Sequence, residues 1–139
     1  VSMTGVTATA SGGTNSNYGV YNYNSSPSMT NVTATATGGT YSYGVRNYSS
    51  SPTMTDVTAT ATGGAGDNYG VFNGLSSSPS IRNSSITGDD YSIYNSGSSS
   101  AQVADTMLDG TVAAGGGLTC VGAYDETFAA FDSSCVVIP

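Results

Sequence analysis

The stretch PSMTNVTATATGG at residues 27–39 decides the fold, because close copies of it recur along the chain. It returns as PTMTDVTATATGG at residues 52–64, and an earlier copy, VSMTGVTATASGG, occupies residues 1–13. Weaker copies are PSIRNSSITG at residues 79–88 and AQVADTMLDG at residues 101–110. Self-similarity at a period of this length is typical of a solenoid, in which each repeat forms one coil.

A second motif follows each copy of the first. Its five versions are YGVYN at 18–22, YGVRN at 43–47, YGVFN at 69–73, YSIYN at 91–95 and VGAYD at 121–125. The paired motifs therefore predict about five coils of 22–27 residues each.

The residues inside one repeat alternate with a period of two. In VTATAT at residues 32–37 the apolar side chains share one face and the threonines share the other, which fits a strand and no helix. An antiparallel sandwich would need a hairpin turn such as Asn-Gly at each corner, and Asn-Gly occurs once, at Asn73. The sequence therefore predicts an all-β, right-handed parallel β-helix.

Stacking the coils predicts columns of equivalent residues. The three apolar columns are Met3, Met29, Met54, Ile81 and Val103; Val6, Val32, Val57, Ile86 and Leu108; and Val20, Val45, Val71, Ile93 and Ala123. The two polar columns are Asn22, Asn47, Asn73, Asn95 and Asp125; and Gly5, Asn31, Asp56, Asn83 and Asp105. Buried amides stacked at the strand spacing of about 4.8 Å can bond to one another along a column. We expect such ladders here, and therefore no glycosylation at the sequons of Asn31, Asn47 and Asn83.

Composition excludes several kinds of partner. The 139 residues suit one domain, and two basic residues against nine acidic ones leave a net charge of −7. Nucleic acid, acidic polysaccharide and anionic membrane would meet almost no compensating charge. The sequence also has no apolar run long enough to span a membrane.

The two ends of the chain predict different surroundings. Cys120 and Cys135 are expected to form a disulfide within a C-terminal cap, which suits a secreted or cell-surface protein. We divide the chain into β-helix repeats at 1–110 and the last coil with its cap at 111–139. The first coil carries stacking residues and no capping segment, so we expect upstream coils or another subunit to cover it.

The repeat SPSMTNVTATATGG, followed by a YGV motif, resembles the right-handed parallel β-helix repeats of the pectin-lyase-like superfamily. Such repeats occur in bacterial surface proteins, adhesins and phage-tail proteins. The resemblance covers about residues 1–110, and the tail LTCVGAYDETFAAFDSSC looks like the terminal cap of such proteins. It implies a structural or adhesive module of a surface protein, filament or fibre.

Some members of this superfamily process polysaccharides, with residues that this sequence mostly lacks. Lyases use an Arg or Lys base with calcium, and the only candidates are Arg46 and Arg82. Hydrolases of the polygalacturonase type use an Asp-Asp pair, Gly-His-Gly and Arg-Ile-Lys; Asp89 and Asp90 match the pair, but the chain has no His and no Lys. We therefore predict no catalytic residues and no cofactor, with a degraded polysaccharide-processing domain as a further alternative.

The acidic residues of the cap are candidate metal ligands. Asp125, Glu126 and Asp132 could offer oxygen ligands to calcium, but their spacing matches no calcium-binding loop. We expect a solvated cap face and no metal site.

Two outward surfaces remain as candidate binding sites. One is a grid of hydroxyl and methyl groups that could bind ice, as threonine arrays do on β-solenoid antifreeze proteins; it comprises Thr7, Thr9, Thr33, Thr35, Thr37, Thr58, Thr60 and Thr62. The other is a column that could stack against sugar rings; it comprises Tyr21, Arg46, Phe72, Tyr94 and Tyr124. For each surface the alternative is purely structural: threonine suits exposed strands, and aromatic rings stabilise one another between coils.

Overall fold

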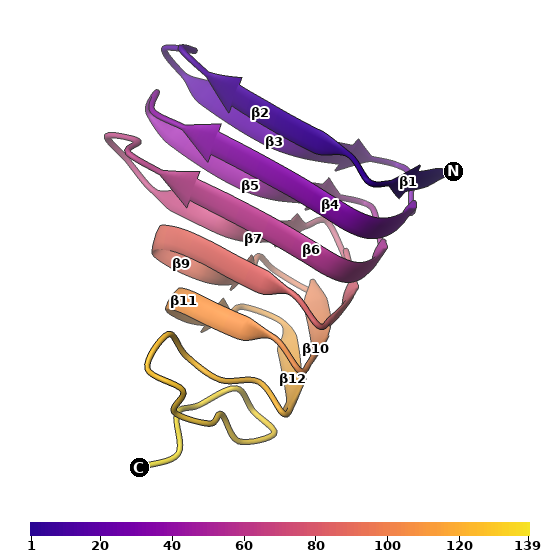
Figure 1. Ribbon diagram of the computed structural model, residues 1–139, viewed down its shortest axis with the longest axis vertical. Helices are drawn as coiled ribbons and strands as arrows, with labels where there is room; N and C mark the ends of the chain where they lie inside the picture. The colour runs from indigo at the N-terminus through magenta and orange to yellow at the C-terminus, as the bar shows by residue number, and fades with distance from the viewer.

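The repeats form a parallel β-solenoid of about four turns, without helices, in which each coil lies directly on the one before it (Figure 1). The computed structural model describes the backbone of residues 1–139 and every side chain except that of Ala114. Its strands are β1 Ser2–Thr4, β2 Thr7–Ser11, β3 Ser16–Tyr23, β4 Ser28–Thr37, β5 Tyr41–Tyr48, β6 Thr53–Thr62, β7 Asn68–Gly74, β8 Ser80–Arg82, β9 Ser85–Asn95, β10 Ser100–Ala104, β11 Met107–Ala114 and β12 Gly117–Val121.

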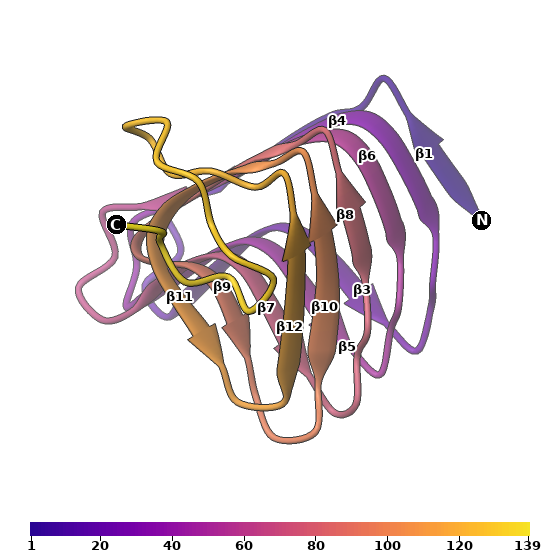
Figure 2. The same cartoon turned by 90° about the horizontal axis from the view of Figure 1, so that it is seen from below.

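Every strand pairing in the solenoid is parallel, and equivalent residues of the repeats face one another. One stack comprises β1, the start of β4, the start of β6, β8, β10 and β12, the last three of which lie side by side in Figure 2. Its inward column is Met3, Met29, Met54, Ile81, Val103 and Cys120. Successive members are 26, 25, 27, 22 and 17 residues apart, so the coils shorten toward the C-terminus.

The core lies between the stacked strands. Met29, Met54 and Ile81 are fully buried, and small residues allow the opposite walls to approach closely. A Cβ atom on Gly44 would lie 2.6 Å from the carbonyl oxygen of Gly70 and 2.8 Å from the backbone nitrogen of Thr60. A side chain at position 44 would therefore collide with backbone atoms on both sides.

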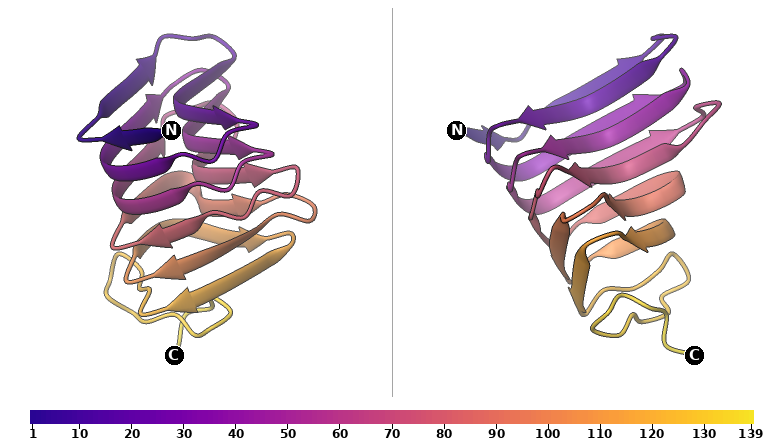
Figure 3. Two further views of the ribbon diagram at one scale, coloured as in Figure 1. Left: turned by 90° about the vertical axis from the view of Figure 1, so that its right-hand side faces the viewer. Right: turned by 180° about the vertical axis from the view of Figure 1, so that it is seen from behind.

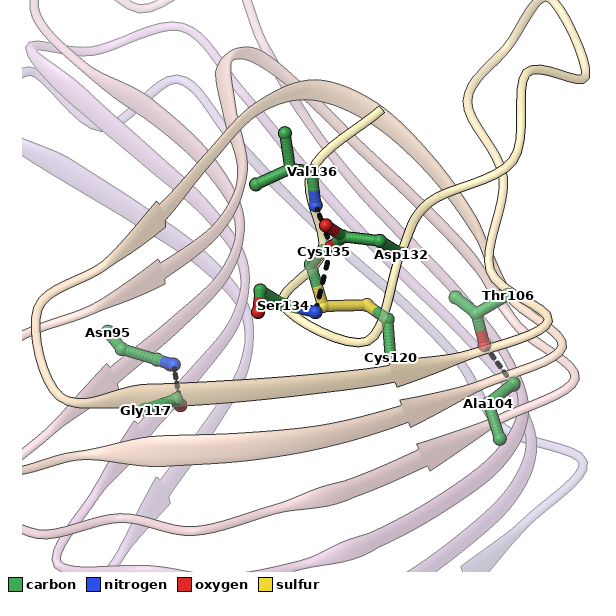
Figure 4. Close-up of a disulfide and its surroundings, with 9 residues drawn as sticks. All are labelled: Asn95, Ala104, Thr106, Gly117, Cys120, Asp132, Ser134, Cys135 and Val136. Atoms are coloured by element: carbon green, nitrogen blue, oxygen red, sulfur yellow. Dashed lines mark hydrogen bonds between the residues drawn. A yellow bond between two sulfur atoms is a disulfide. The ribbon is translucent and has the colours of Figure 1, made fainter. Parts of the chain in front are cut away.

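The predicted asparagine ladder is confirmed for four of its five members. The Nδ2 atom of Asn22 donates to Oδ1 of Asn47, Asn47 donates to Asn73, and Asn73 donates to Asn95, at 2.8–2.9 Å. The last amide, Asn95, donates to the carbonyl oxygen of Gly117 at 2.9 Å (Figure 4). The fifth predicted member, Asp125, lies in the cap instead.

The second polar column exists, but its members are exposed, so the expectation of buried amides is wrong there. All five residues have left-handed backbone, with φ from 47° to 64°: Gly5, Asn31, Asp56, Asn83 and Asp105. Gly, Asn and Asp adopt this conformation most readily, which explains the residue types at this corner. Burial protects the sequon of Asn47 but not those of Asn31 and Asn83.

The structure also corrects the end of the repeat. Val112 pairs with Ile93, in the place predicted for Ala123, and Tyr124 pairs with Met107. The segment VGAYD therefore begins a partial coil instead of completing a fifth one. Because β11 already fills the register opposite β9, about four turns form, and β11 crosses the predicted boundary between residues 110 and 111.

The second apolar column is wrong in its later members as well. Ile86 pairs with Ala59, and Leu108 pairs with Ile86, so both belong to the column of Ala8, Ala34 and Ala59. In this coil Ser84 takes the place after the left-handed corner, and its hydroxyl accepts a hydrogen bond from the backbone nitrogen of Val57. The larger apolar residue has moved two positions along the strand and stays on the inward face.

The two ends of the solenoid differ, as Figure 3 shows. At the C-terminal end the Cys120–Cys135 disulfide, with Cα atoms 5.2 Å apart, ties the tail against the last strand (Figure 4). At the N-terminal end β1 and β2 pair only with β4, and their outer edges are unpaired. Met3, Val6 and Ala8 are therefore half-buried, whereas Met29, Val32 and Ala34 of the next coil are fully buried.

Candidate functional site

The eight predicted threonines form one surface, which we call the threonine face. Parallel pairing aligns Thr7 with Thr33 and Thr58, and likewise Thr9 with Thr35 and Thr60, across β2, β4 and β6. Thr37 and Thr62 form a third rank, in which Ser11 holds the place of the first coil. These three strands run side by side in Figure 1. The register therefore produces the regular grid that the sequence predicted.

The hydroxyl groups of the threonine face form no hydrogen bond to the described side chains or backbone. Within the part of the chain whose side chains the structure describes, the threonine hydroxyls that form hydrogen bonds belong to Thr40, Thr106 and Thr127, all outside the face. Beneath the grid, the alanines of the same strands are fully buried: Ala34, Ala36, Ala59 and Ala61. The face thus offers unpaired hydroxyls on a backbone fixed from below.

The threonine face loses its regularity toward the C-terminus. In the next coil Ser85 continues the first rank and Thr87 the second, and after them come Met107 and Asp109. A methionine and a carboxylate do not repeat the hydroxyl and methyl pattern, so the grid is limited to about three coils.

The sheet of β3, β5, β7 and the end of β9 carries an aromatic face. Its column of Tyr21, Arg46, Phe72 and Tyr94 is confirmed by the pairing. The predicted fifth member, Tyr124, is not part of it: Ala113 pairs with Tyr94, while Tyr124 lies beside Met107 and stacks on Phe128 at 5.7 Å. The cause is again that β11, and not the segment VGAYD, lies opposite β9.

A neighbouring ladder of tyrosines was not singled out as a surface in the sequence. Tyr18, Tyr43, Tyr69 and Tyr91 stack with ring centroids 5.0, 5.1 and 5.4 Å apart and ring planes within 16° of parallel. The tyrosine that opens each YGV-type motif was the signal for it. Because each ring face lies against the next ring, the stacking stabilises the coils and leaves few free faces for a sugar.

Arg46 lies within the aromatic face and forms no ion pair with a carboxylate among the described side chains. Its guanidinium carbon is 5.2–5.6 Å from the centroids of five rings: Tyr18, Tyr21, Tyr43, Tyr48 and Phe72. Its Nη1 atom donates to the hydroxyl oxygen of Tyr18 at 2.9 Å, and its Nε atom is buried without a hydrogen-bond partner. Cation–π attraction to the surrounding rings offsets part of the cost of burying this charge.

Two tyrosines of this ladder have raised pKa values. Burial is the largest cause for Tyr69, whose hydroxyl also donates to Oδ2 of Asp67 at 2.9 Å, and the two effects raise the pKa of Tyr69 well above its usual value. Burial likewise raises the pKa of Tyr43, against the lowering effect of Arg46. Both phenols therefore stay neutral at ordinary pH.

The Asp89–Asp90 pair accepts hydrogen bonds from the preceding coil. Oδ2 of Asp89 accepts from the backbone nitrogen of Gly63 at 2.7 Å, and Oδ2 of Asp90 accepts from the backbone and side-chain nitrogens of Asn68 at 2.8 and 2.9 Å. Both carboxylates thus fix a corner between two coils, which gives each of them a structural role.

The acidic residues of the cap bond to its own turns. Oδ1 of Asp125 accepts from the hydroxyl of Thr127 and from the backbone nitrogens of Thr127 and Ala129, and these bonds lower the pKa of Asp125. Oδ1 of Asp132 accepts from the backbone nitrogens of Ser134 and Val136 (Figure 4). Among the described residues, no group of three or more acidic, His or Cys side chains could hold a metal ion.

A shallow groove of about 290 Å³ lies over β8, β10 and β12 and was not predicted. Its lining includes the exposed side chains of Arg82 and Gln102 and the half-buried Ser80 and Ala104.

The chain matches no protein-family model, and it matches neither the curated proteins nor the solved structures compared with it. In the described chain, no helix is long and apolar enough to cross a membrane.

Proposed function

We propose that this chain is a non-catalytic, extracellular β-solenoid module that forms a structural or adhesive part of a larger surface object. The observation that carries the proposal is the unpaired edge of β1 and β2. Met3 is half-buried, although the equivalent Met29 and Met54 are fully buried, and the outer edges of β1 and β2 carry unpaired backbone groups. Such an edge is a template for pairing with another strand.

The partner that fits this end is another β-coil of the same kind. The first coil keeps the apolar column and the left-handed corner in register with the second, so a preceding coil with the same pattern would continue both. Upstream coils and a second subunit both have this chemistry. The C-terminal end is covered by the disulfide-linked tail, so identical copies of this chain would not stack head to tail.

The surroundings of the charged residues support a non-catalytic role. Arg46 is surrounded by aromatic rings, and the two carboxylates of Asp89 and Asp90 hold backbone and amide nitrogens. The disulfide fits an oxidising, extracellular setting. A module of the pectin-lyase-like type on a bacterial surface or phage-tail-like fibre suits these features, with Tyr21 and Tyr23, 45% and 57% exposed, as contact points for glycans.

Light scattering over a range of protein concentrations tests the open end. Two copies of the isolated chain are expected to associate head to head, with the edges of β1 and β2 facing each other, and Met3→Asp is expected to abolish that association. Ser100→Asp, in β10, is the matched control and should leave association unchanged. A chain that stays monomeric at high concentration, or equal effects of the two substitutions, would reject the proposal.

A further inference from the structure

We infer that the threonine face binds ice, by ordering water on its repeated hydroxyl and methyl groups. This activity is independent of the open N-terminal end, because it uses a different surface. It rests on the register of β2, β4 and β6 and on the unpaired hydroxyls. It rests also on the strand segments 7–11, 33–37 and 58–62, which contain no charged residue.

The grid repeats in two directions at the spacings of a β-sheet. Successive outward residues along a strand lie about 7 Å apart, and neighbouring coils lie about 4.8 Å apart. These distances are close to the oxygen repeats on a prism face of hexagonal ice. The pairing of β4 with β6 runs from Thr58 to Thr62 without a register shift, so the spacing between the two strands is kept along the whole grid. A crystalline ligand requires that kind of two-dimensional order.

The hydroxyls of the face can engage water without first breaking bonds to the protein. The hydroxyls of Thr35 and Thr60, at the centre of the grid, have no hydrogen-bond partner among the residues with described side chains, and both side chains are half-buried. Threonine is branched at Cβ and has few χ1 rotamers, so little conformational entropy is lost when the surface orders water. The buried alanines below prevent the strands from shifting.

The composition of the face favours ice over a polysaccharide. Sugar rings are recognised largely by aromatic faces, and the face-forming strands β2, β4 and β6 contain no aromatic residue. The aromatic side chains of the coils lie on the other sheet, formed by β3, β5, β7 and β9. Methyl and hydroxyl groups in alternation instead offer water both an apolar patch and a bonding position.

Thermal hysteresis and retention on an ice surface provide the test, with the full chain carrying Met3→Asp so that association through the open end is removed. Thr35→Lys places a long charged side chain at the centre of the grid and should reduce retention on ice at least tenfold. Thr53→Lys is the matched control, because Thr53 is an exposed position of the neighbouring strand β6, on the other side of the Asp56 corner from the grid. This control should retain the activity of its parent.

The outcomes separate cleanly. Thermal melting of each variant checks that the coils remain folded, and Thr35→Ser, which keeps the hydroxyl and removes only a methyl, provides a second, milder probe that should weaken retention. Absence of hysteresis and of ice retention in the folded parent would overturn the inference. An equal loss from Thr53→Lys would overturn it as well. Neither result would bear on the open end, which is tested by light scattering in unfrozen solution.

Discussion

The Nδ2 atom of Asn47 donates a hydrogen bond to Oδ1 of Asn73 at 2.9 Å, and both side chains are fully buried. The bond joins residues 26 positions apart in the chain and lies in the middle of a ladder that joins four coils. Asn47 and Asn73 each accept from the preceding amide and donate to the next, so removal of either one takes a partner from two neighbours. Polar groups in such a network have large individual effects on stability.

Replacing Asn47 by Leu is therefore expected to lower the free energy of unfolding by about 1–3 kcal/mol, because buried donors and acceptors lose their partners. Chemical denaturation measures the change. Asn15→Leu, at an exposed position, is the control and should change stability by less than about 0.5 kcal/mol. An unchanged midpoint for Asn47→Leu would mean that the amides are hydrated.

Gly44→Ala should also destabilise the protein, for a steric reason. The new methyl group would lie 2.6 Å from the carbonyl oxygen of Gly70, and backbone atoms on both sides prevent relaxation. We expect a loss of about 1–3 kcal/mol or more, measured as a lower melting temperature. In Gly117→Ala the added Cβ would lie 3.6 Å from Cβ of Ser100, an ordinary contact, and this variant should melt close to the parent.

The disulfide should matter for the cap more than for the first coils. Cys120→Ser together with Cys135→Ser removes the cross-link that closes a loop of 15 residues. By the chain-entropy estimate, closing such a loop stabilises the folded state by about 3 kcal/mol. Hydrogen exchange should show faster exchange in residues 117–139, with little change in β4 and β5. Titration of the native parent should detect no free thiol, and two free thiols would contradict the pairing.

Stability should fall in alkaline solution because of Tyr69. Its pKa is raised in the folded protein, so the unfolded chain ionises first, near the ordinary tyrosine pKa of about 10. The stabilising contribution of neutral Tyr69 is complete below that pH and is lost as the pH rises toward the folded-state pKa. Urea midpoints between pH 8 and 11 measure the loss. Tyr69→Phe keeps the stacked ring and should show a shallower decline, whereas an identical decline would assign the effect to other groups.

Much of the fold could be predicted from the sequence, because the repeats share the same alternation of apolar and polar residues. Val32 and Thr33 point to opposite faces, as do their equivalents in the first and third copies, and a register error of one residue would expose the whole apolar set. The last coil was harder to predict. VGAYD resembles YGVYN in letters, but the shortening of the coil to 17 residues moves Tyr124 beside Met107, and such shortening depends on tertiary packing.

The two candidate surfaces also differ in how far they could be predicted from the sequence. The threonine face follows directly from the pairing of Thr33 with Thr58 and could be predicted. The cluster of rings around Arg46 could not, because it depends on side-chain rotamers and on a Tyr18 hydroxyl from the preceding coil. The serine ladder at another corner was also missed, although its members recur once per coil: the hydroxyls of Ser50, Ser77 and Ser99 accept from the backbone nitrogens of Ser25, Ser50 and Ser77.

The turn between the two long strands of a coil differs in length from coil to coil, while the left-handed corner does not. It spans residues 38–40 after β4 and 63–67 after β6, and in β9 the strand continues through it without a break. A foreign peptide inserted between Gly63 and Gly66 should therefore project from the third coil without changing the register of the strands. The same tolerance would let the gene lengthen by duplication of whole coils, since copies with unequal turns still stack at the corner of Asn31 and Asp56.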